Sequence, residues 1–473
     1  MVERRWKVLI VTSTAAFMAL LDVTIVNIAF PDIRVSFRGD SLVGLSWILN
    51  GYSVVFAAAL VPAGRLADRF GRKRMFLAGV LVFLVASAVC GLAPSVGVLV
   101  AARVMQALGG AVLMPTSLAL ILPEFPLEKR AMATALWTAT GAVAAATGPS
   151  LGGLLVDWYG WRSVFFVNLL IGLPALIPAS RLLRENRDEQ AAGWPDLAGA
   201  VLLLVGVGAL ALAIVEGQGW GWTSLRVLGA FVVAVIALAV FVWRSAGHPT
   251  PVVDLSMFRV RSFAVASAGT FVFGIGFFGL LLCNVLFLTT AWHYSIVHAG
   301  TALTPGPVAA AIMAPVSGRL SDRFGQRLVA VPGNLLFGAG SLLLLLNTTA
   351  HPHYWTAFFP ATTLGGLGVG LSLPAFGSAA VAELPRTRFA TGAGIVTCFR
   401  QLGAVLGIAA LVAIIGTPTL GDPAAAFHRA WSLVAVSGLV AALISIALGR
   451  VRARHVEVAP RTAVAESAAS RAR

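Results

Sequence analysis

Residues 64–74 read GRLADRFGRKR, a stretch that places five cations and one acid between two long apolar runs. Residues 318–327 read GRLSDRFGQR, so the charged segment returns nearly unchanged 254 residues later. Charges are scarce in this chain, because only 11% of its residues are charged and 58% are hydrophobic. A charged loop that recurs at long range in so apolar a chain indicates two duplicated membrane-embedded halves.

The composition excludes several classes of protein. A soluble domain carries roughly 25% charged residues, whereas this chain of 473 residues carries 11% and has a mean hydropathy of +0.89. Its net charge of +15 comes from cations in short loops, with no basic tract that could follow a nucleic-acid backbone. The sequence has no metal-ligand spacing, no catalytic constellation and no GxxxxGK[ST] motif. We therefore expect a membrane protein that is not an enzyme and needs no cofactor, metal, ATP or nucleic acid.

The apolar runs predict an all-α membrane protein. A spanning helix needs about 20 mostly apolar residues, and the sequence contains fourteen such segments. They cover approximately 8–30, 43–63, 75–93, 97–120, 131–155, 163–182, 196–216, 226–244, 262–290, 297–317, 328–347, 354–375, 391–416 and 430–449. An even number of spans places both termini on the same side of the membrane.

The loop cations predict which side that is. With the N-terminus in the cytoplasm, 27 of the 34 Lys and Arg residues fall in cytoplasmic segments and five fall in outer loops. Cytoplasmic loops of membrane proteins carry an excess of Lys and Arg. We therefore predict a multi-pass protein of the cytoplasmic membrane with both termini inside. The remaining two cations, Arg103 and Arg400, lie within predicted helices.

The repeat predicts how the spans are grouped. The first charged segment follows the second span, and the second follows the tenth span, whereas a plain duplication of six helices would place it after the eighth. Two helices are therefore inserted between the halves. The predicted units are a six-helix half at 1–183, a linker with two inserted helices at 184–261, a six-helix half at 262–450 and a disordered cytoplasmic tail at 451–473.

Seven short motifs occur in a characteristic order along the chain. They are LDVTIVN at 21–27, the charged segment at 64–74, RVMQALGG at 103–110, GPSLGG at 148–153, GWRSVFFVN at 160–168, EGQGWGW at 216–222 and RQLG at 400–403. On these motifs the sequence resembles the major facilitator superfamily, and within it the fourteen-helix drug:proton antiporters. The resemblance extends from about Val8 to Arg450, and it implies the major facilitator fold with alternating access to a cavity between the two halves.

The charged segment is expected to act as a latch. A glycine at either end suits a close approach and a left-handed turn, and Asp68 has cationic neighbours. The resemblance implies that Asp68 contacts the positive N-terminus of another helix and holds the halves together on the cytoplasmic side. The alternative is a cation cluster that only anchors the loops. The expected latch residues in the two copies are Gly64, Asp68, Gly71, Arg72, Asp322 and Arg323.

Asp22 is the most informative single residue. It lies about 21 Å along the first predicted span, well inside the hydrocarbon. An intramembrane acid is costly and is a functional candidate by default, and burial favours the protonated form of a carboxyl group. Arg103 is expected at a comparable depth on the fourth span and could pair with Asp22. The pair is therefore a candidate for proton coupling, as the resemblance also implies, and the alternative is a static ion pair that fixes packing.

The motif at 148–153 resembles the one that marks antiporters in the family. Pro149 removes a helical hydrogen bond and kinks the helix, and Gly148, Gly152 and Gly153 permit close helix contact. The chain departs from the family pattern at Ala144, where the family has glycine. The alternative is general packing of small residues.

Four polar residues inside the spans could line a substrate cavity. They are Asn27, Gln106, Asn284 and Gln401. For each of them, the alternative is a hydrogen bond that serves only packing between helices.

The sequence thus predicts a proton-driven antiporter that exports amphipathic small molecules, such as drugs or antibiotics, and works as a monomer in the bilayer. An exporter dedicated to one metabolite or lipid would have the same fold and cycle. A non-transporting membrane sensor is a more remote alternative, which predicts that Asp22 is dispensable.

Overall fold

The computed structural model describes residues 3–126, 129–187, 194–385, 388–415 and 424–448. Within this part of the chain every regular element is helical, and fourteen helical segments are long and apolar enough to cross a membrane. The predicted all-α class and the predicted number of spans are confirmed. The tail predicted at 451–473 lies outside the described residues.

Six helices form the N-terminal half, and a pair of helices follows it. The N-terminal helices are α1 (Arg4–Ser36), α2 (Leu42–Phe70), α3 (Arg72–Leu92), α4 (Val96–Ile121), α5 (Arg130–Tyr159) and α6 (Ser163–Leu182), with the short η1 (Leu122–Glu124) after α4. The pair consists of α7 (Leu197–Trp220) and α8 (Leu225–Gly247), and the short η3 (Leu255–Arg259) follows it.

The C-terminal half contains the remaining helices. They are α9 (Arg261–Thr290), α10 (Ile296–Leu303), α11 (Pro305–Phe324), α12 (Arg327–Asn347), α13 (Phe359–Ala382), α14 (Phe389–Ile415) and α15 (Ala425–Ile446), with the π-helical turn η4 (Tyr354–Phe358) before α13. The span predicted as one helix at 297–317 is therefore two helices, α10 and α11. The break falls at Thr304, because Pro305 has no N–H group to continue the hydrogen-bonding pattern.

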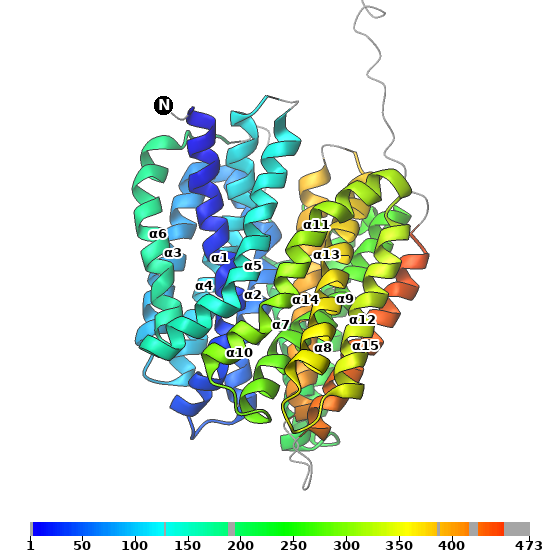
Figure 1. Cartoon of the computed structure of the whole chain (residues 1–473). Helices are drawn as coiled ribbons and strands as arrows, with labels where there is room; N and C mark the ends of the chain where they lie inside the picture. Colours follow the sequence, from blue (N-terminus) through cyan, green and yellow to red (C-terminus); the bar gives the residue numbers. More distant parts are fainter. Residues whose placement is uncertain (1–2, 127–128, 188–193, 386–387, 416–423, 449–473) are drawn as a thin grey trace, which may run out of the picture.

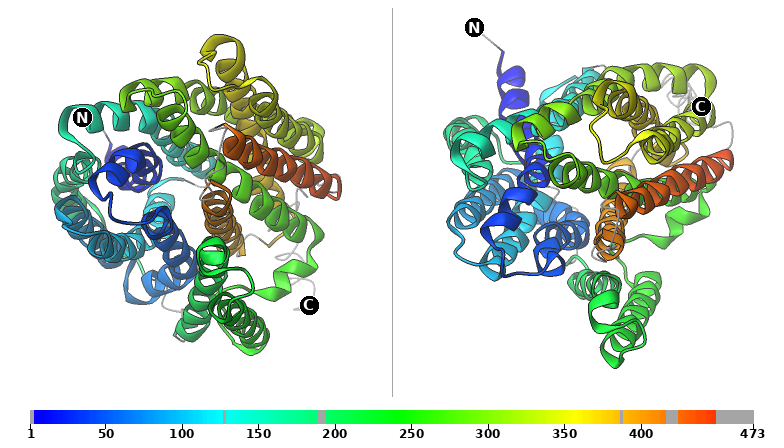
Figure 2. Two further views of the ribbon diagram at one scale, coloured as in Figure 1. Left: turned by 90° about the horizontal axis from the view of Figure 1, so that it is seen from below. Right: turned by 60° about the horizontal axis from the view of Figure 1, so that its bottom comes forward.

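The two halves stand side by side as separate bundles (Figure 1). They touch where α2 packs against α14, where α5 packs against α10 and α11, and where α1 approaches α9 and α10. The α7–α8 pair lies outside both bundles, and α7 contacts both α2 and α14 (Figure 2). The inserted pair therefore covers one side of the seam between the halves.

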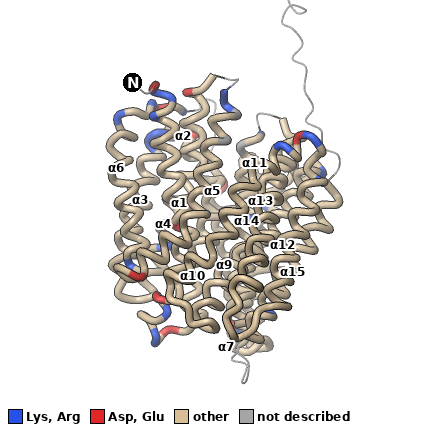
Figure 3. The backbone as a smooth tube through the Cα atoms, in the orientation of Figure 1, with Lys and Arg blue, Asp and Glu red and all other residues tan. Residues whose placement is uncertain are grey.

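Charged residues gather at the two ends of the bundles, and few lie in the middle (Figure 3). The end that carries the N-terminus also carries both copies of the charged segment, and we refer to it as the arginine-rich end. The positive-inside rule predicts that this end faces the cytoplasm.

The charged segment at 64–74 is helical rather than the loop that the sequence predicts. Helix α2 continues to Phe70 and α3 starts at Arg72, so Gly71 alone separates them, with φ of +109°. A residue with a Cβ atom rarely adopts this backbone conformation, and glycine adopts it readily. Gly325, with φ of +90°, ends α11 in the same way. The sequence repeat is thus also a repeat of local structure.

The beginning of the linker closes over this turn. The Glu185 carboxylate accepts hydrogen bonds from the backbone N–H groups of Lys73 (3.0 Å) and Arg74 (3.2 Å), and the N–H group of Arg72 donates to the Asn186 carbonyl (2.9 Å). The first N–H groups of a helix have no partner within the helix, and its N-terminus attracts negative charge. Glu185 therefore caps α3 from a distant part of the sequence.

Replacing Gly71 with alanine will destabilise the protein more than replacing Gly325. Both substitutions place a Cβ atom in a disfavoured backbone region, which costs about 1–3 kcal/mol. At Gly71 the new Cβ atom would also lie 2.6 Å from the Glu185 carboxylate, whereas at Gly325 nothing lies within 4 Å. The midpoints of thermal unfolding of the two purified variants in one detergent test this difference, and equal shifts would contradict it.

Candidate functional site

The centre of the N-terminal half holds a buried ion pair. Asp22 lies near the middle of α1, and Arg103 lies in the second turn of α4. The Arg103 Nη1 atom donates to Asp22 Oδ2 over 2.5 Å, and the exposed fractions of the two side chains are 1% and 0%. The structure therefore places these two predicted residues in direct contact, in a region that water does not reach.

Three further polar side chains complete the surroundings of the Asp22 carboxylate. Gln106 Nε2 donates to Asp22 Oδ1 (2.8 Å) and to Ser87 Oγ (2.8 Å), and Asn168 Nδ2 donates to Asp22 Oδ1 (3.0 Å). All three side chains are fully buried. Because they come from α3, α4 and α6, the network connects four helices of this half.

Arg103 has acceptors besides the carboxylate. Its Nε atom donates to the Ile48 carbonyl of α2 (3.2 Å), and Nη1 also donates to Gln106 Oε1 (2.6 Å). The guanidinium lies over the Tyr52 ring at 4.2 Å, which adds a cation–π interaction. The cation thus stays bound to polar and aromatic groups even when its contact with Asp22 is broken.

A pair of this kind is costly to disturb. Removing one partner of a buried ion pair typically costs about 3–5 kcal/mol, because the other charge is left uncompensated. Binding a proton to Asp22 removes the negative charge without removing the side chain. Protonation is therefore the least disruptive way to weaken the attraction between α1 and α4.

The sequence did not locate all of this network. Asn168 ends the GWRSVFFVN motif, and its place in that motif is a signal that could have identified it. Ser87 lies within an apolar run and gives no signal of its own. Gln106, which the sequence places among the possible cavity residues, contacts the Asp22 carboxylate instead of an open space.

Asp22 and Arg103 lie at the same depth, as the sequence predicts, because their side chains are in direct contact. Asp22 lies about 21 Å from the C-terminal end of α1, and Arg103 lies about 10 Å from the start of α4. The two distances differ because α1 continues to Ser36, beyond the apolar run at 8–30 that defined the predicted span. Hydropathy marks where a helix enters water and not where its hydrogen bonds end.

The two copies of the latch segment differ in their contacts. The Asp68 carboxylate accepts hydrogen bonds from Arg72 Nε (2.9 Å) and Nη2 (2.8 Å), and it forms no hydrogen bond or ion pair with the described residues of the C-terminal half. Asp322 is exposed and forms no ion pair with any described residue, and Gln326 stands where the first copy has Arg72. A latch between the halves therefore stays a prediction. Gly64, another of the expected latch residues, packs against Pro115 of α4.

The predicted antiporter motif lies where the two halves meet. A Cβ atom at Gly148 or Gly152 would collide with Thr24 or Ile25 of α1, so these glycines let α5 pack closely on α1. On the neighbouring face, Gly153 lies against the backbone of Ile296 and Val297 at the start of α10.

The same contact continues along α10. A Cβ atom at Gly300 would collide with the Pro149 carbonyl oxygen, and Ser150 Oγ lies 2.5 Å from the Thr304 hydroxyl. The motif thus joins α5 of one half to α10 of the other, at the end of the bundle opposite the arginine-rich end.

The other predicted cavity residues lie in different surroundings. Asn27 donates to the Val23 carbonyl of its own helix, and its Oδ1 atom is buried without a partner. Asn284 Oδ1 accepts a hydrogen bond from the Trp431 indole (2.9 Å), so this amide joins α9 to α15. Gln401 is buried on α14.

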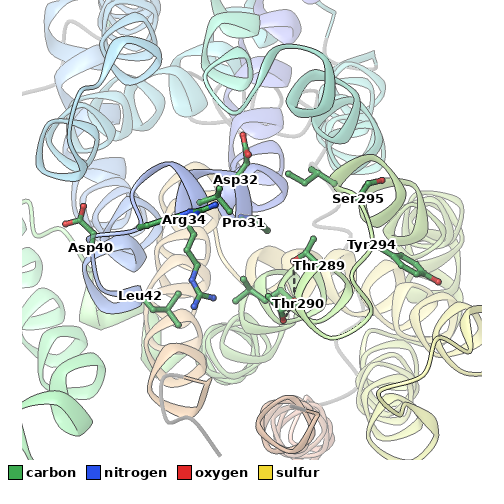
Figure 4. Close-up of a pocket in the computed structure, with 13 residues that line it drawn as sticks. Pro31, Asp32, Arg34, Asp40, Leu42, Thr289, Thr290, Tyr294 and Ser295 are labelled. Carbon is green, nitrogen blue, oxygen red and sulfur yellow. Dashed lines mark hydrogen bonds between the residues drawn. The ribbon is translucent and has the colours of Figure 1, made fainter. Parts of the chain in front are cut away.

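A cavity of about 620 Å³ lies between the halves at the end opposite the arginine-rich end. Figure 4 shows its lining, which comes from the end of α1, the loop before α2, the end of α9 and the loop before α10. Arg34 and Arg38 line it and form no ion pair with any described residue. The carboxylate of Asp32, which also lines the cavity, accepts a hydrogen bond from the backbone N–H group of Trp161.

The profile of the Major Facilitator Superfamily matches residues 12–282 and 266–471, which together cover almost the whole chain. The chain belongs to the major facilitator superfamily. It is therefore a multi-pass protein of a membrane transporter family, and the fold predicted from its motifs is confirmed.

Similar proteins of this superfamily carry names that refer to resistance and export. Multidrug resistance protein Stp of Mycobacterium tuberculosis is 36% identical over 86% of this chain and 75% of its own length. The tetracenomycin C resistance and export protein of Streptomyces glaucescens is 34% identical over 89% of this chain and 77% of its own length. A crystal structure of a peptide transporter described as POT has a TM-score of 0.67, with 17% identity, 94% of this chain covered and 96% of that chain. At that identity the structural similarity shows the major facilitator fold alone.

Replacing Gly300 with alanine will loosen the contact between α5 and α10, because the new methyl group has no room beside the Pro149 carbonyl. Cysteines introduced by Ser150→Cys and Thr304→Cys report on this contact, since the two native hydroxyl oxygens lie 2.5 Å apart. We expect the disulfide between them to form several-fold more slowly after Gly300→Ala.

Gly229→Ala on α8 is the matched control, because nothing lies within 4 Å of its Cβ position. The three native cysteines are buried and should stay unreactive. An unchanged crosslinking rate in the Gly300→Ala protein would contradict the role of this close approach.

Proposed function

We propose that this chain is a proton-coupled antiporter that exports amphipathic small molecules across the cytoplasmic membrane by alternating access. The observation that carries the proposal is the Asp22–Arg103 pair, a titratable acid buried in the middle of a transporter with its cation attached. The names of similar proteins, which include the multidrug efflux pump LfrA of Mycolicibacterium smegmatis at 31% identity, support an export role.

Asp22 is the proposed proton carrier. In its ionised form the carboxylate holds Arg103, Gln106 and Asn168. When a proton binds, Arg103 loses its counter-charge but keeps the Ile48 carbonyl and Gln106 as acceptors. The pair can therefore open and close without leaving a bare cation in the membrane, and α1 can shift relative to α4 with each proton.

The contacts between the halves supply the moving parts. The α5–α10 contact closes the end opposite the arginine-rich end, and in the proposed cycle it opens to release substrate on the outer side. The Asp68–Arg72 pair belongs to the proposed latch that closes the cytoplasmic side when the substrate site faces outward. Because both contacts form within one chain, a monomer suffices for the cycle.

The substrate cavity of this proposal lies between the halves. Asn27 suits it better than Asn284, because its buried Oδ1 atom has no partner, whereas the Asn284 oxygen is already bonded to Trp431. The driving force is the proton gradient, since the sequence has no GxxxxGK[ST] motif for ATP.

An exporter dedicated to one metabolite is the second candidate. Some similar proteins have names that refer to a single compound, and this favours the second candidate. An example is the methylenomycin A resistance protein of Streptomyces coelicolor, which is 34% identical to this chain. The two candidates share the cycle described above and differ only in the breadth of substrates.

The proposal is tested by efflux from pump-deficient cells that express the wild type or the Asp22→Asn variant. A cationic, a neutral and an acidic fluorescent amphipath are used as substrates, with and without a protonophore. We expect wild-type efflux of at least one of them to stop with the protonophore, and Asp22→Asn efflux to fall to the level of cells without the pump. The reason is that asparagine keeps the size of the side chain but cannot carry the proton.

Asp157→Asn is the matched control, because it removes an exposed carboxylate at the end of α5. Its efflux should equal that of the wild type at equal amounts of protein in the membrane. Efflux that survives Asp22→Asn would overturn the proton-carrier role, and efflux of a single compound from a wider panel would favour the dedicated exporter.

A further inference from the structure

Arg400 is an isolated cation in the middle of a C-terminal helix. It lies about 16 Å from the start of α14, whereas the other described arginines of the C-terminal half lie near helix ends. The described acids of this half are Asp322 and Glu383, and both are exposed at helix ends. No carboxylate of the described C-terminal helices therefore lies at the depth of Arg400.

The Arg400 guanidinium forms no hydrogen bond or ion pair with any described residue, and its Nε atom is buried without a partner. The contrast with Arg103 is complete, since that side chain has a carboxylate, an amide and a carbonyl as acceptors. A charged group inside a membrane protein is costly unless it is paired. An unpaired arginine at this position therefore calls for a partner that comes from outside the chain.

The packing of α14 shows which way Arg400 faces. The helix packs on α9 through Gly403 and Gly407 and approaches α2 at Gly394. Phe399 packs against Phe258 of η3, on the flank next to the inserted helices. Successive residues of a helix are spaced about 100° apart around its axis. Phe399 and Arg400 therefore lie on opposite sides of the face of α14 that packs on α9.

The two flanks of α14 also differ in their side chains. The flank of Phe399 carries Ile395, Leu402 and Leu406, whereas the flank of Arg400 carries Ala393, Thr397 and Ala404. Large apolar residues suit the side covered by α7 and lipid, and small residues leave room beside a charged group. Arg400 is half-buried, and its Nε atom is fully buried.

We propose that Arg400 is the anion-binding subsite of the substrate cavity, and that the exported amphipaths include molecules that carry a carboxylate or an acidic phenol. This inference rests on the proposed export function and adds the substrate class to it. A guanidinium binds a carboxylate through two parallel hydrogen bonds, which gives both affinity and orientation. The described C-terminal helices have no carboxylate at the depth of Arg400 that could bind a lipophilic cation.

The cavity at the far end of the seam lies on the proposed exit side. Arg34 and Arg38 line it without an ion pair to any described residue, and the carboxylates of Asp32 and Asp40 line it too. Figure 4 shows Arg34 extending toward the space between Leu42 and Thr290, where the two halves face each other.

Pyrenebutyrate and pyrenebutanol test the proposal, because they share an aromatic body and differ in the carboxylate. Binding of each to the purified full-length protein in detergent is followed by pyrene fluorescence. We expect the wild type to bind the acid about tenfold or more tightly than the alcohol, as a charged hydrogen bond would provide. Arg400→Gln should lose this preference, Arg400→Lys should keep part of it, and Arg429→Gln on the surface of α15 should not change it.

Equal binding of the two probes by the wild type would overturn the proposal, and so would a preference for the acid that survives Arg400→Gln. Because the wild-type comparison needs no variant, misfolding of a substituted protein does not prevent the test. Transport of the acid in proteoliposomes with a proton gradient is measured separately. Selective binding without transport would refute the export function and leave the subsite in place.

Discussion

The structure depends on the attraction between one acid and one cation in the middle of a membrane bundle. Neither Asp22 nor Arg103 could be buried alone, because an isolated charge in so apolar an interior is costly. Together they draw Gln106, Asn168 and Ser87 into one network and fix the relative positions of four helices. The interaction that stabilises this half is also the one that a proton can weaken. Stability and the proposed coupling therefore have the same physical origin.

The duplication has been followed by divergence of the two halves. The N-terminal half keeps a buried acid with its cation and a charged turn in which Asp68 and Arg72 are paired. The C-terminal half keeps the glycine turn at Gly325 but has Gln326 in place of the paired arginine. Its central charge, Arg400, has no acid to match it among the described residues. In this account one half binds the proton and the other half binds the charge of the substrate.

Much of the fold could be predicted from the sequence, because the constraints of a membrane act on local sequence. Apolar length predicts a span, and a charged segment that occurs twice predicts the repeat. Hydropathy does not predict the break between α10 and α11, since Pro305 lies inside a continuous apolar run. The sequence does not predict the cap of α3 by Glu185 for a different reason, because the two segments lie more than a hundred residues apart in the chain.

The candidate site could be predicted only in part. Asp22 and Arg103 are conspicuous because a charge inside an apolar run is rare, and their contact requires only that two helices be neighbours. Polar but uncharged residues are harder to interpret. Asn168 contacts the acid while Asn284 contacts Trp431, and the sequence around each amide does not reveal its partner. Such assignments depend on which helices pack together, and that is a property of the whole fold.

The most direct test of the central claim is the release of protons when substrate binds. Antiport requires that substrate and proton weaken each other's binding, and this coupling must act in both directions. The purified protein is placed in weakly buffered detergent solution with a pH indicator, and a transported substrate is added. The account predicts that the wild type releases protons on binding and that the Asp22→Asn protein binds the substrate without releasing any. Equal proton release from both proteins would contradict the assignment of Asp22 as the proton carrier.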